Sequence, residues 1–389
     1  MKIGIVGLGY RLGYLAQVMS EIVPDARVVG YVDPAPAGLP LLQKKGIASG
    51  PSYETIEALV AAEKPDLLMV GSPNHLHLDH IRTGLEFGLK IFSEKPVVTT
   101  EEQTFELLDL LARSGGRDQV MIGLVLRYAP LYRDLVAVHR DGTLGKITSI
   151  EASEHIAPYH GAFFMRDWRR AGGWSGGFML EKCCHDIDLY QGLVGGRPTR
   201  ISSFGGRRTF VPENSPALRG INDLEVYYRK PSGWMGTEKV FDSDGDIIDY
   251  QMAMVEFEGG ETLSFHTNLN VPDEFRRFCV VGSRGMAEGD FVRNFFRVHD
   301  AHTANKLIDK SYEASPLSVH YGADEQMIGD IFAHVIDGKP LPVSIVDGLA
   351  AGLTAIKMDE ARARRQVIEM APTWQRFDSY GLTGGGGAP

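Results

Sequence analysis

The sequence predicts an α/β protein with two domains, in which a doubly wound parallel sheet is followed by an α+β domain with a largely antiparallel sheet. Three observations support this fold class. The chain has 389 residues, which is long for a single hydrophobic core. Strand-like and helix-like patterns alternate over its first third, as they do in parallel α/β sheets. After Arg127 the pattern changes to longer strands whose residues alternate between polar and apolar.

The elements of the first third follow one another in a regular order. Residues 3–6 form a short apolar run bounded by glycines, which is typical of a buried parallel strand. A helix is expected at residues 12–23, because Leu15, Val18 and Ile22 recur at helical spacing. This order favours right-handed crossovers between parallel strands. The remaining expected elements are strands at residues 27–32, 67–70, 89–92 and 120–125, and helices at residues 56–62 and 77–87.

The second domain is expected to pair most of its strands antiparallel, with glycine-rich and polar loops between them. The stretch 205–245 is polar and rich in Gly and Pro, which predicts a long loop or an insertion. We therefore place the domains at residues 1–125 and 126–380, followed by a flexible tail at residues 381–389. The expected elements are strands at residues 146–153, 247–257 and 262–268, and helices at residues 322–335 and 347–367.

Composition excludes several classes of protein. A formal net charge of −10 disfavours a nucleic-acid-binding surface. No segment approaches the roughly 20 apolar residues of a membrane span, and the apolar run near Met1 is too short for a signal peptide. The 3 cysteines are an odd number, so no disulfide framework is implied. We expect a cytoplasmic protein that binds neither nucleic acid nor membrane.

A glycine-rich turn follows the first expected strand and opens the first expected helix. Gly7 permits a tight turn, and Gly9 lets the backbone approach a pyrophosphate at the positive end of that helix. The third glycine, Gly13, stands one position later than in the usual fingerprint. Asp33 ends the second expected strand, where a carboxylate accepts hydrogen bonds from a ribose and repels a 2′-phosphate. The pattern predicts NAD as the cofactor, and Arg11 leaves NADP open as the alternative.

Two further turns come directly after expected strands. Glu94-Lys95-Pro96 follows the strand at residues 89–92. A turn at residues 72–77, with the sequence Ser-Pro-Asn-His-Leu-His, follows the strand at residues 67–70. Ligands of doubly wound sheets lie outside the carboxyl ends of the strands. Lys95 is therefore a candidate for contact with a ligand.

A polar triplet lies on a helix expected near residue 180. Glu181, His185 and Asp188 are spaced four and then three residues apart, so they share one helix face. A histidine held by a carboxylate can take a proton from an alcohol near neutral pH. A solvated polar face with a surface histidine is the alternative, and spacing alone favours it. The glycines at residues 172–177 shift the balance toward a site, because they allow a ligand to come close.

Two stretches of the sequence resemble metal sites, but each lacks required ligands. His75, His77 and His80 resemble a cluster of ligands, but no Cys or acidic residue completes a convincing zinc set. The acidic run at residues 242–246 begins like a calcium loop and lacks the required Gly and Glu. We predict no metal.

The combination of motifs resembles a known family, the Gfo/Idh/MocA oxidoreductases. The resemblance runs from Met1 to about Val367. It implies an N-terminal Rossmann domain and a C-terminal domain built on a large open sheet. Family members oxidise or reduce sugars, inositols and related polyols, and many are dimers or tetramers joined through the open sheets. The resemblance therefore implies a homodimer or homotetramer that acts on a small-molecule sugar or polyol.

The resemblance also implies roles for single residues. In the family the lysine of Glu-Lys-Pro contacts substrate and nicotinamide, which corresponds to Lys95. The family's helix motif is commonly Asp-x-x-x-His with histidine as the acid–base residue, which corresponds to Glu181 and His185, with Glu in place of the usual Asp. Asp188 is expected to anchor the helix or to bind a substrate hydroxyl. An Arg-Tyr pair and a Trp-Arg pair of the family match Arg127-Tyr128 and Trp168-Arg169.

These inferences give three sets of candidate residues. The expected activity is hydride transfer between a secondary hydroxyl of a sugar, glycoside or inositol and the nicotinamide of NAD(P). The alternatives are a redox-neutral enzyme that cleaves or epimerises glycosides with tightly bound NAD, and a nucleotide-binding sensor. The candidates are catalytic Lys95, His185 and Glu181; cofactor-binding Gly7, Gly9, Tyr10, Arg11, Asp33, Ser72, Pro73, Asn74, His77, Glu94 and Lys95; and substrate-binding Arg127, Tyr128, His155, Trp168, Arg169 and Asp188.

Overall fold

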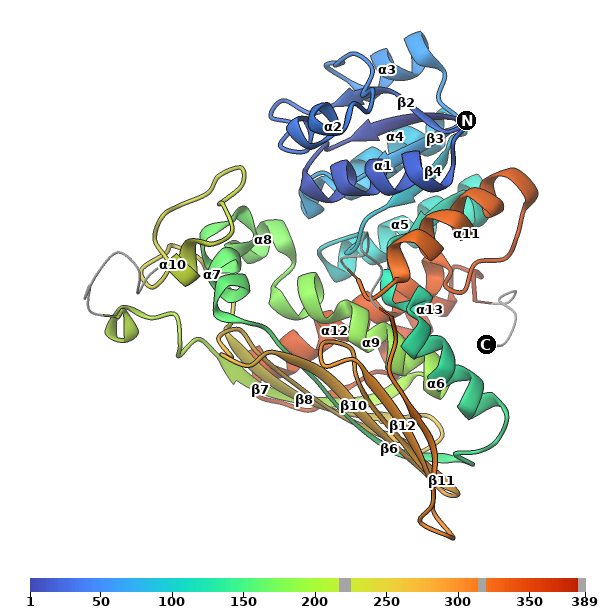
Figure 1. The fold of residues 1–389 in the computed structure, drawn as a ribbon, viewed down its shortest axis with the longest axis vertical. Coiled ribbons are helices and arrows are strands. Elements are labelled where there is room, and N and C mark those ends of the chain that lie inside the picture. Colours follow the sequence, from blue (N-terminus) through green and yellow to red (C-terminus); the bar gives the residue numbers. More distant parts are fainter. Residues whose placement is uncertain (217–224, 314–319, 384–389) are drawn as a thin grey trace. The chain divides into compact units, whose positions relative to one another are not determined.

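The computed structural model describes residues 1–216, 225–313 and 320–383, which form two compact units (Figure 1). The first unit comprises residues 1–129 and the described parts of 314–350 and 375–388. The second unit comprises residues 351–374 and the described parts of 130–313. The boundary expected near residue 125 lies close to the end of the first run, but the first unit also takes in segments from the C-terminal part of the chain.

The first unit is built on a five-stranded parallel sheet in the order β2-β1-β3-β4-β5. The expected parallel sheet is confirmed. The last strand is shorter than predicted, since it ends at Ile122 and the chain then forms the 3-10 helix η3 (Val125–Tyr128). The strands are β1 (Lys2–Val6), β2 (Arg27–Val32), β3 (Leu67–Val70), β4 (Lys90–Ser93) and β5 (Val120–Ile122).

Helices connect these strands. All four residues of β3 are buried, as expected for a parallel strand with both faces covered. Thr100 caps α5 by accepting a hydrogen bond from the backbone nitrogen of Gln103 at 3.1 Å. The helices are α1 (Tyr10–Ile22), α2 (Leu39–Lys45), α3 (Ile56–Glu63), η1 (Asn74–Leu76), α4 (His77–Glu86), α5 (Glu101–Ser114) and η2 (Gly116–Asp118).

Helix α11 (Ala323–Asp337) explains why the first unit is not contiguous in sequence. It packs against α1 and η3, so its apolar face is buried by the parallel-sheet unit. Helix α12 (Ile345–Arg364) contributes its first residues to this unit and the remainder to the second, and α13 (Ala371–Asp378) also crosses the division. Residues 384–389 of the expected tail lie outside the described part of the chain.

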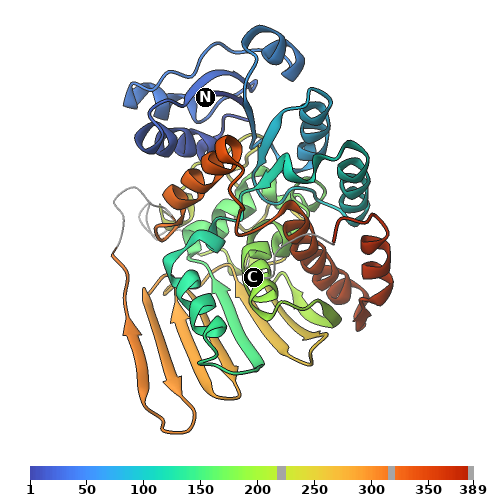
Figure 2. The ribbon, with the colours of Figure 1, turned by 90° about the vertical axis from the view of Figure 1, so that its right-hand side faces the viewer.

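The second unit is built on a nine-stranded sheet in the order β13-β12-β11-β10-β6-β9-β8-β7-β14. Every neighbouring pair is antiparallel except β6 and β9, which confirms the mainly antiparallel sheet. Figure 2 shows β12 and β13 in orange at one edge. The strands are β6 (Ile147–His155), β7 (Pro198–Gly206), β8 (Tyr250–Phe257), β9 (Thr262–Asn268), β10 (Phe275–Gly282), β11 (Gly285–Asp290), β12 (Phe295–Asp300), β13 (Lys306–Lys310) and β14 (Ile368–Glu369).

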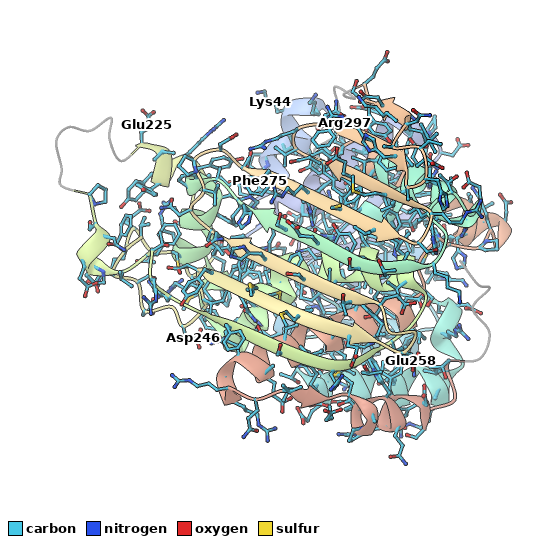
Figure 3. The ribbon with its side chains drawn as sticks, turned by 90° about the horizontal axis from the view of Figure 1, so that it is seen from below. Lys44, Glu225, Asp246, Glu258, Phe275 and Arg297 are labelled. Atoms are coloured by element: carbon cyan, nitrogen blue, oxygen red, sulfur yellow. The ribbon has the colours of Figure 1, made fainter. Side chains whose placement is uncertain are left out.

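One face of this sheet is covered by helices. Helix α9 (Phe178–Val194) packs on β6, and α6 (Pro130–Arg140) packs on α9, where Tyr132 donates a hydrogen bond to the carbonyl of Leu189 at 2.9 Å. The opposite face is turned toward the viewer in Figure 3, and no described helix of this unit crosses it. The shorter helices are α7 (Pro158–Arg166), η4 (Trp168–Arg170), α8 (Gly172–Ser175), η5 (Pro212–Asn214) and α10 (Glu225–Tyr228).

The stretch 205–245, expected as a loop or insertion, is held in place by two buried arginines. Residues 217–224 of this stretch lie outside the described part of the chain. Arg166 donates hydrogen bonds to the carbonyl of Lys230 at 2.9 Å and to Glu238 at 3.2 Å. Arg170 donates to the carbonyl of Met235 at 2.7 Å and to Asp244 at 2.6 Å. The described part is therefore anchored to α7 and η4.

Candidate active site

Gly7 and Gly9 lie at the point where the strand order of the first unit reverses, between β1 and β3. Gly7 has a φ of +80°, and a Cβ there would come within 2.3 Å of the Ser72 nitrogen. Gly9 is the N-cap residue of α1 without a side-chain cap, and a Cβ there would meet nothing within 4 Å. The N-terminus of α1 is therefore open to an anion, as in dinucleotide-binding sites.

Asp33 stands directly after β2, at the position of a ribose-binding carboxylate. Its Oδ1 accepts a hydrogen bond from the Ala35 nitrogen at 2.7 Å. Burial raises the pKa of Asp33, and the backbone N–H groups of Ala35 and Leu8 act in the opposite direction. The nitrogen of Gly38 donates to the carbonyl of Leu8 at 2.8 Å, so the loop after β2 lies against the glycine turn.

Arg11 is held by two carboxylates of the first unit. Its Nε donates to Glu94 Oε1 at 2.7 Å, and its Nη1 donates to Asp324 Oδ1 at 2.7 Å. Asp324 is fully buried, and His320 Nδ1 lies 3.0 Å from its Oδ2. Burial opposes the ionisation of Asp324, but Arg11 and His320 outweigh it and hold the pKa of that carboxyl well below its usual range. In the sequence, Arg11 was a possible ligand for the 2′-phosphate of NADP. Its guanidinium is instead paired with Glu94 and Asp324.

His77 joins the two turns that were predicted to flank the ligand. Its Nδ1 lies 2.8 Å from the carbonyl oxygen of Pro96, and its Nε2 lies 2.8 Å from that of Ser72. Carbonyl oxygens only accept hydrogen bonds, so the ring donates to both only as an imidazolium. Lys95 precedes Pro96 through a cis peptide bond. His77 thus holds the Glu-Lys-Pro turn against the turn after β3.

The other candidates of the first unit lie in these turns or in η3. Ser72 is buried, and its hydroxyl lies 2.9 Å from His80 Nδ1. Burial, together with His77, lowers the pKa of His80 to about 4. The remaining positions are Pro73 before η1, buried Asn74 within η1, exposed Tyr10 at the start of α1, and half-buried Arg127 and buried Tyr128 in η3.

Helix α9 carries the predicted acid–base residues of the second unit. Glu181 lies in its first turn, and Glu181, His185 and Asp188 are all buried, so the surface-histidine alternative is wrong. Glu181 Oε1 accepts a hydrogen bond from Arg169 Nε at 2.7 Å. The glycine run predicted to allow close approach leads into this helix, since Gly177 has a φ of +87° at its N-cap.

Arg169 is fixed from three sides. Besides Glu181, its guanidinium donates to Asp167 Oδ1 at 2.8 Å and lies 4.3 Å from the ring centroid of Trp168. Asp167 is buried and also accepts a hydrogen bond from the Gly233 nitrogen at 3.1 Å. The Trp168-Arg169 pair therefore orients the Glu181 carboxylate at the start of α9.

A buried ionic cluster fixes α9 to the sheet. Arg276 of β10 bonds Asp186 through Nε at 2.9 Å and through Nη2 at 2.5 Å, and its Nη1 lies 3.1 Å from Glu154 of β6. Lys182 lies 2.7 Å from the same Glu154 oxygen. Burial opposes the ionisation of Glu154, but Arg276 and Lys182 outweigh it and lower its pKa. Burial raises the pKa of Asp186 despite its pairing with Arg276.

His155 is placed apart from the α9 residues. It follows Glu154 in β6, and successive strand residues point to opposite faces, so His155 lies on the face away from α9. There it lies 4.9 Å from His266 and 4.6 Å from Phe275 between ring centroids, and it lines a hollow of about 690 Å³. Burial, with His266 and Arg277, lowers its pKa to about 4. The structure does not bring this predicted substrate ligand together with Glu181.

Sequence reasoning missed the residues that support these candidates. Arg166, Asp167 and Arg170 connect η4 to the stretch after β7, and Asp324 holds Arg11 from a distant helix. One signal was present, because residues 166–170 hold four charged residues directly before a glycine run. Their partners could not be identified, since they lie far away in sequence.

No group of three or more His, Cys, Asp and Glu residues in the described ranges is arranged to hold a metal ion. None of the helices within those ranges is long and apolar enough to cross a membrane.

Two family models match the chain. The model of an oxidoreductase family with an NAD-binding Rossmann fold, Gfo/Idh/MocA, matches residues 1–123. The model of the C-terminal alpha/beta domain of that family matches residues 140–370. Together the two matches cover most of the chain.

Individual proteins extend this likeness. The Bacillus subtilis (strain 168) protein YteT, named as an oxidoreductase, is 24% identical, with 92% of this chain and 94% of that protein aligned. The 2,7-anhydro-N-acetylneuraminate hydratase of Mediterraneibacter gnavus is 26% identical over 52% of this chain and 51% of its own length. The crystal structure of scyllo-inositol dehydrogenase from Lactobacillus casei, with NAD(H) and scyllo-inositol, superimposes with a TM-score of 0.72 at 20% identity, covering 95% and 99% of the two chains.

Proposed function

The chain belongs to the Gfo/Idh/MocA oxidoreductase family, and from this premise we propose that it is a dehydrogenase of sugars, glycosides or inositols that uses NAD. The observation that carries the proposal is the start of α9, where Arg169 holds Glu181 one helical turn before His185. A buried histidine close to a fixed carboxylate suits proton transfer to and from an alcohol. The structure of the Lactobacillus casei relative with scyllo-inositol supports a polyol as the substrate.

The first unit fits the cofactor that the family binds. Gly9 leaves the N-terminus of α1 without a side chain, which suits a pyrophosphate. Asp33 stands where a ribose diol is bound, and Arg11, paired with Glu94 and Asp324, does not offer its charge to a 2′-phosphate. These features suit NAD better than NADP.

The proposed mechanism divides the chemistry between two residues. His185 takes the proton of a secondary hydroxyl, and Glu181, fixed by Arg169, lies one helical turn before it on the same face of α9. Lys95 orients the same oxygen and stabilises its developing negative charge. Bound NAD would supply the hydride acceptor for the carbon that carries this hydroxyl. In the reverse direction His185 returns the proton.

Substitution of the two catalytic candidates tests the proposal. Lys95→Ala and His185→Ala are each expected to lower kcat by roughly 10²-fold or more, the usual contribution of acid–base catalysis. The measurement is NAD reduction with a panel of sugars, glycosides and inositols. Lys90→Ala provides a matched control, because Lys90 lies at the other end of β4. Turnover close to wild type in both variants contradicts the mechanism.

A redox-neutral enzyme is the second candidate, and the name of one relative favours it. The Mediterraneibacter gnavus protein is named as a hydratase, and it is similar to about half of this chain. In such an enzyme the same residues would remove and return protons while the cofactor is regenerated within each turnover. Release of NADH in proportion to consumed substrate argues against this candidate, and product formation without NADH supports it.

We also propose a cytoplasmic homodimer or homotetramer. Three free cysteines among the described residues suit a reducing compartment. The uncovered sheet face exposes Phe204 and Met254, which suits contact with a second copy. Light scattering of wild type and Met254→Glu tests the assembly, since a monomeric wild type contradicts it.

A further inference from the structure

Lys230 carries a charge that the described part of the chain does not pair. Its ammonium lies 5.3 Å from the ring centroid of Tyr159 and 5.4 Å from that of Phe163, and it forms no ion pair within the described residues. Lys230 is half-buried, and a lysine that loses part of its hydration without a carboxylate partner is destabilised. The two rings offset part of this cost through cation–π attraction.

Hydrogen bonds from Arg166 fix the backbone at Lys230. The buried guanidinium of Arg166 donates to the carbonyl of Lys230 at 2.9 Å and to that of Tyr227 at 3.3 Å. The same guanidinium lies 4.4 Å from the ring centroid of Tyr228. Figure 1 shows α10 beside α7, in agreement with these bonds. The backbone before Lys230 is therefore tied to the helix that supplies its two aromatic neighbours.

Further cations surround Lys230. Arg169 lies 5.6 Å from the centroid of the same Phe163 ring, and Arg229 lies 4.8 Å from that of Tyr159. Burial, followed by the charges of Lys182 and Arg169, lowers the pKa of Lys230 to about 8, while Glu274 opposes the shift. Arg169 is paired with Asp167 and Glu181, whereas neither Lys230 nor Arg229 forms an ion pair within the described residues, so these two residues carry the excess positive charge.

The excess charge lies beside the candidate active site. Phe163 contacts both Lys230 and Arg169, and Arg169 bonds Glu181 at the start of α9. We propose that Lys230 binds an anionic group of the substrate, so that the sugar or polyol carries a carboxylate or a phosphate. This inference rests on the proposed function and names the substrate class for the same site. A bound anion supplies the missing partner, and the flat faces of Tyr159 and Phe163 suit the apolar face of a sugar ring.

The experiment compares three probes that differ in one substituent: D-glucose, D-glucuronate and D-glucose 6-phosphate. Binding to the NADH-loaded enzyme is measured by calorimetry, and kcat/KM is measured where NAD reduction occurs. Wild type is expected to prefer one anionic probe over glucose. Lys230→Gln is expected to lower that preference roughly 10- to 100-fold, which corresponds to a hydrogen bond to a charged group. Lys230→Arg is expected to retain it, and Lys239→Gln, at an exposed lysine of the same segment, serves as the control.

The outcomes separate this inference from the proposed function. A preference for glucuronate assigns a carboxylate, and a preference for glucose 6-phosphate assigns a phosphate. Equal binding of all three probes, no binding of any of them at millimolar concentration, or an unchanged preference in Lys230→Gln overturns the inference. Oxidation of neutral polyols with no effect of Lys230 would leave the proposed dehydrogenase standing. Anion binding that depends on Lys230 without turnover of any polyol would contradict the dehydrogenase alone.

Discussion

The candidate residues of the two units are positioned in different ways. In the first unit the site residues follow the ends of β1, β2, β3 and β4, and their positions are set by backbone geometry at the edge of a parallel sheet. In the second unit the site depends on charged side chains that reach across long sequence distances, such as Arg169 to Glu181 and Arg276 to Asp186. The candidate positions of the first unit are therefore set mainly by local sequence, and those of the second unit depend on tertiary contacts.

The comparison predicts a large effect where the second unit loses the long-range ion pairs of Arg276. Arg276→Met leaves Glu154 and Asp186 buried without their guanidinium, and we expect a loss of about 3–5 kcal/mol in the free energy of unfolding. The measurement is urea unfolding followed by circular dichroism. Arg277→Met is a matched control, because Arg277 is the next residue of β10 and pairs with exposed Glu151. A small and equal effect of both variants would show that α9 does not depend on the buried cluster.

Asp324 tests the first unit, because it lies far from Arg11 in sequence and yet pairs with it in the fold. Asp324→Asn is expected to lower the free energy of unfolding by about 1–3 kcal/mol, since it removes a charged hydrogen-bond acceptor from Arg11. The lowered pKa of Asp324 means that its contribution is present above its unfolded value, near pH 4, and is lost as the pH falls below it. Asp337→Asn, at the exposed end of α11, is expected to have almost no effect. If Asp324→Asn matches this control at pH 7, the first unit needs no long-range contact.

The smallest expected effect concerns His80, which lies close to the switch point of the first unit. Its pKa is about 4 in the folded protein and about 6.5 in the unfolded chain, so the unfolded chain binds more protons between these values. The free energy of unfolding should therefore fall as the pH is lowered from 7 to 5. After allowance for partial exposure, we expect His80 to account for about 1 kcal/mol of this fall. Unfolding midpoints at pH 5, 6 and 7 should change less in His80→Gln, and equal slopes contradict the assignment.

The sequence was most informative about features that follow from the order of strands and helices. The alternation of strands and helices predicted the parallel sheet, and the positions of Gly7, Asp33 and Lys95 after strands follow from that order. The spacing of Glu181 and His185 predicted a shared helix face, because helical periodicity is a local property. The motifs together predicted the Gfo/Idh/MocA family, and the family-model matches to residues 1–123 and 140–370 confirm that family.

Only the tertiary structure shows which charged residues pair with one another. Arg11 was read as a possible phosphate ligand, and only the fold shows that it is held by Glu94 and by Asp324. His155 and Glu154 are neighbours in sequence, yet they point to opposite faces of one sheet. Spacing along the chain determines local geometry, whereas ion pairs between distant segments depend on how those segments pack. For this protein the sequence by itself determined the fold class, the family and the cofactor, because these follow from local patterns and motifs, and the tertiary structure decided the partners of the charged residues.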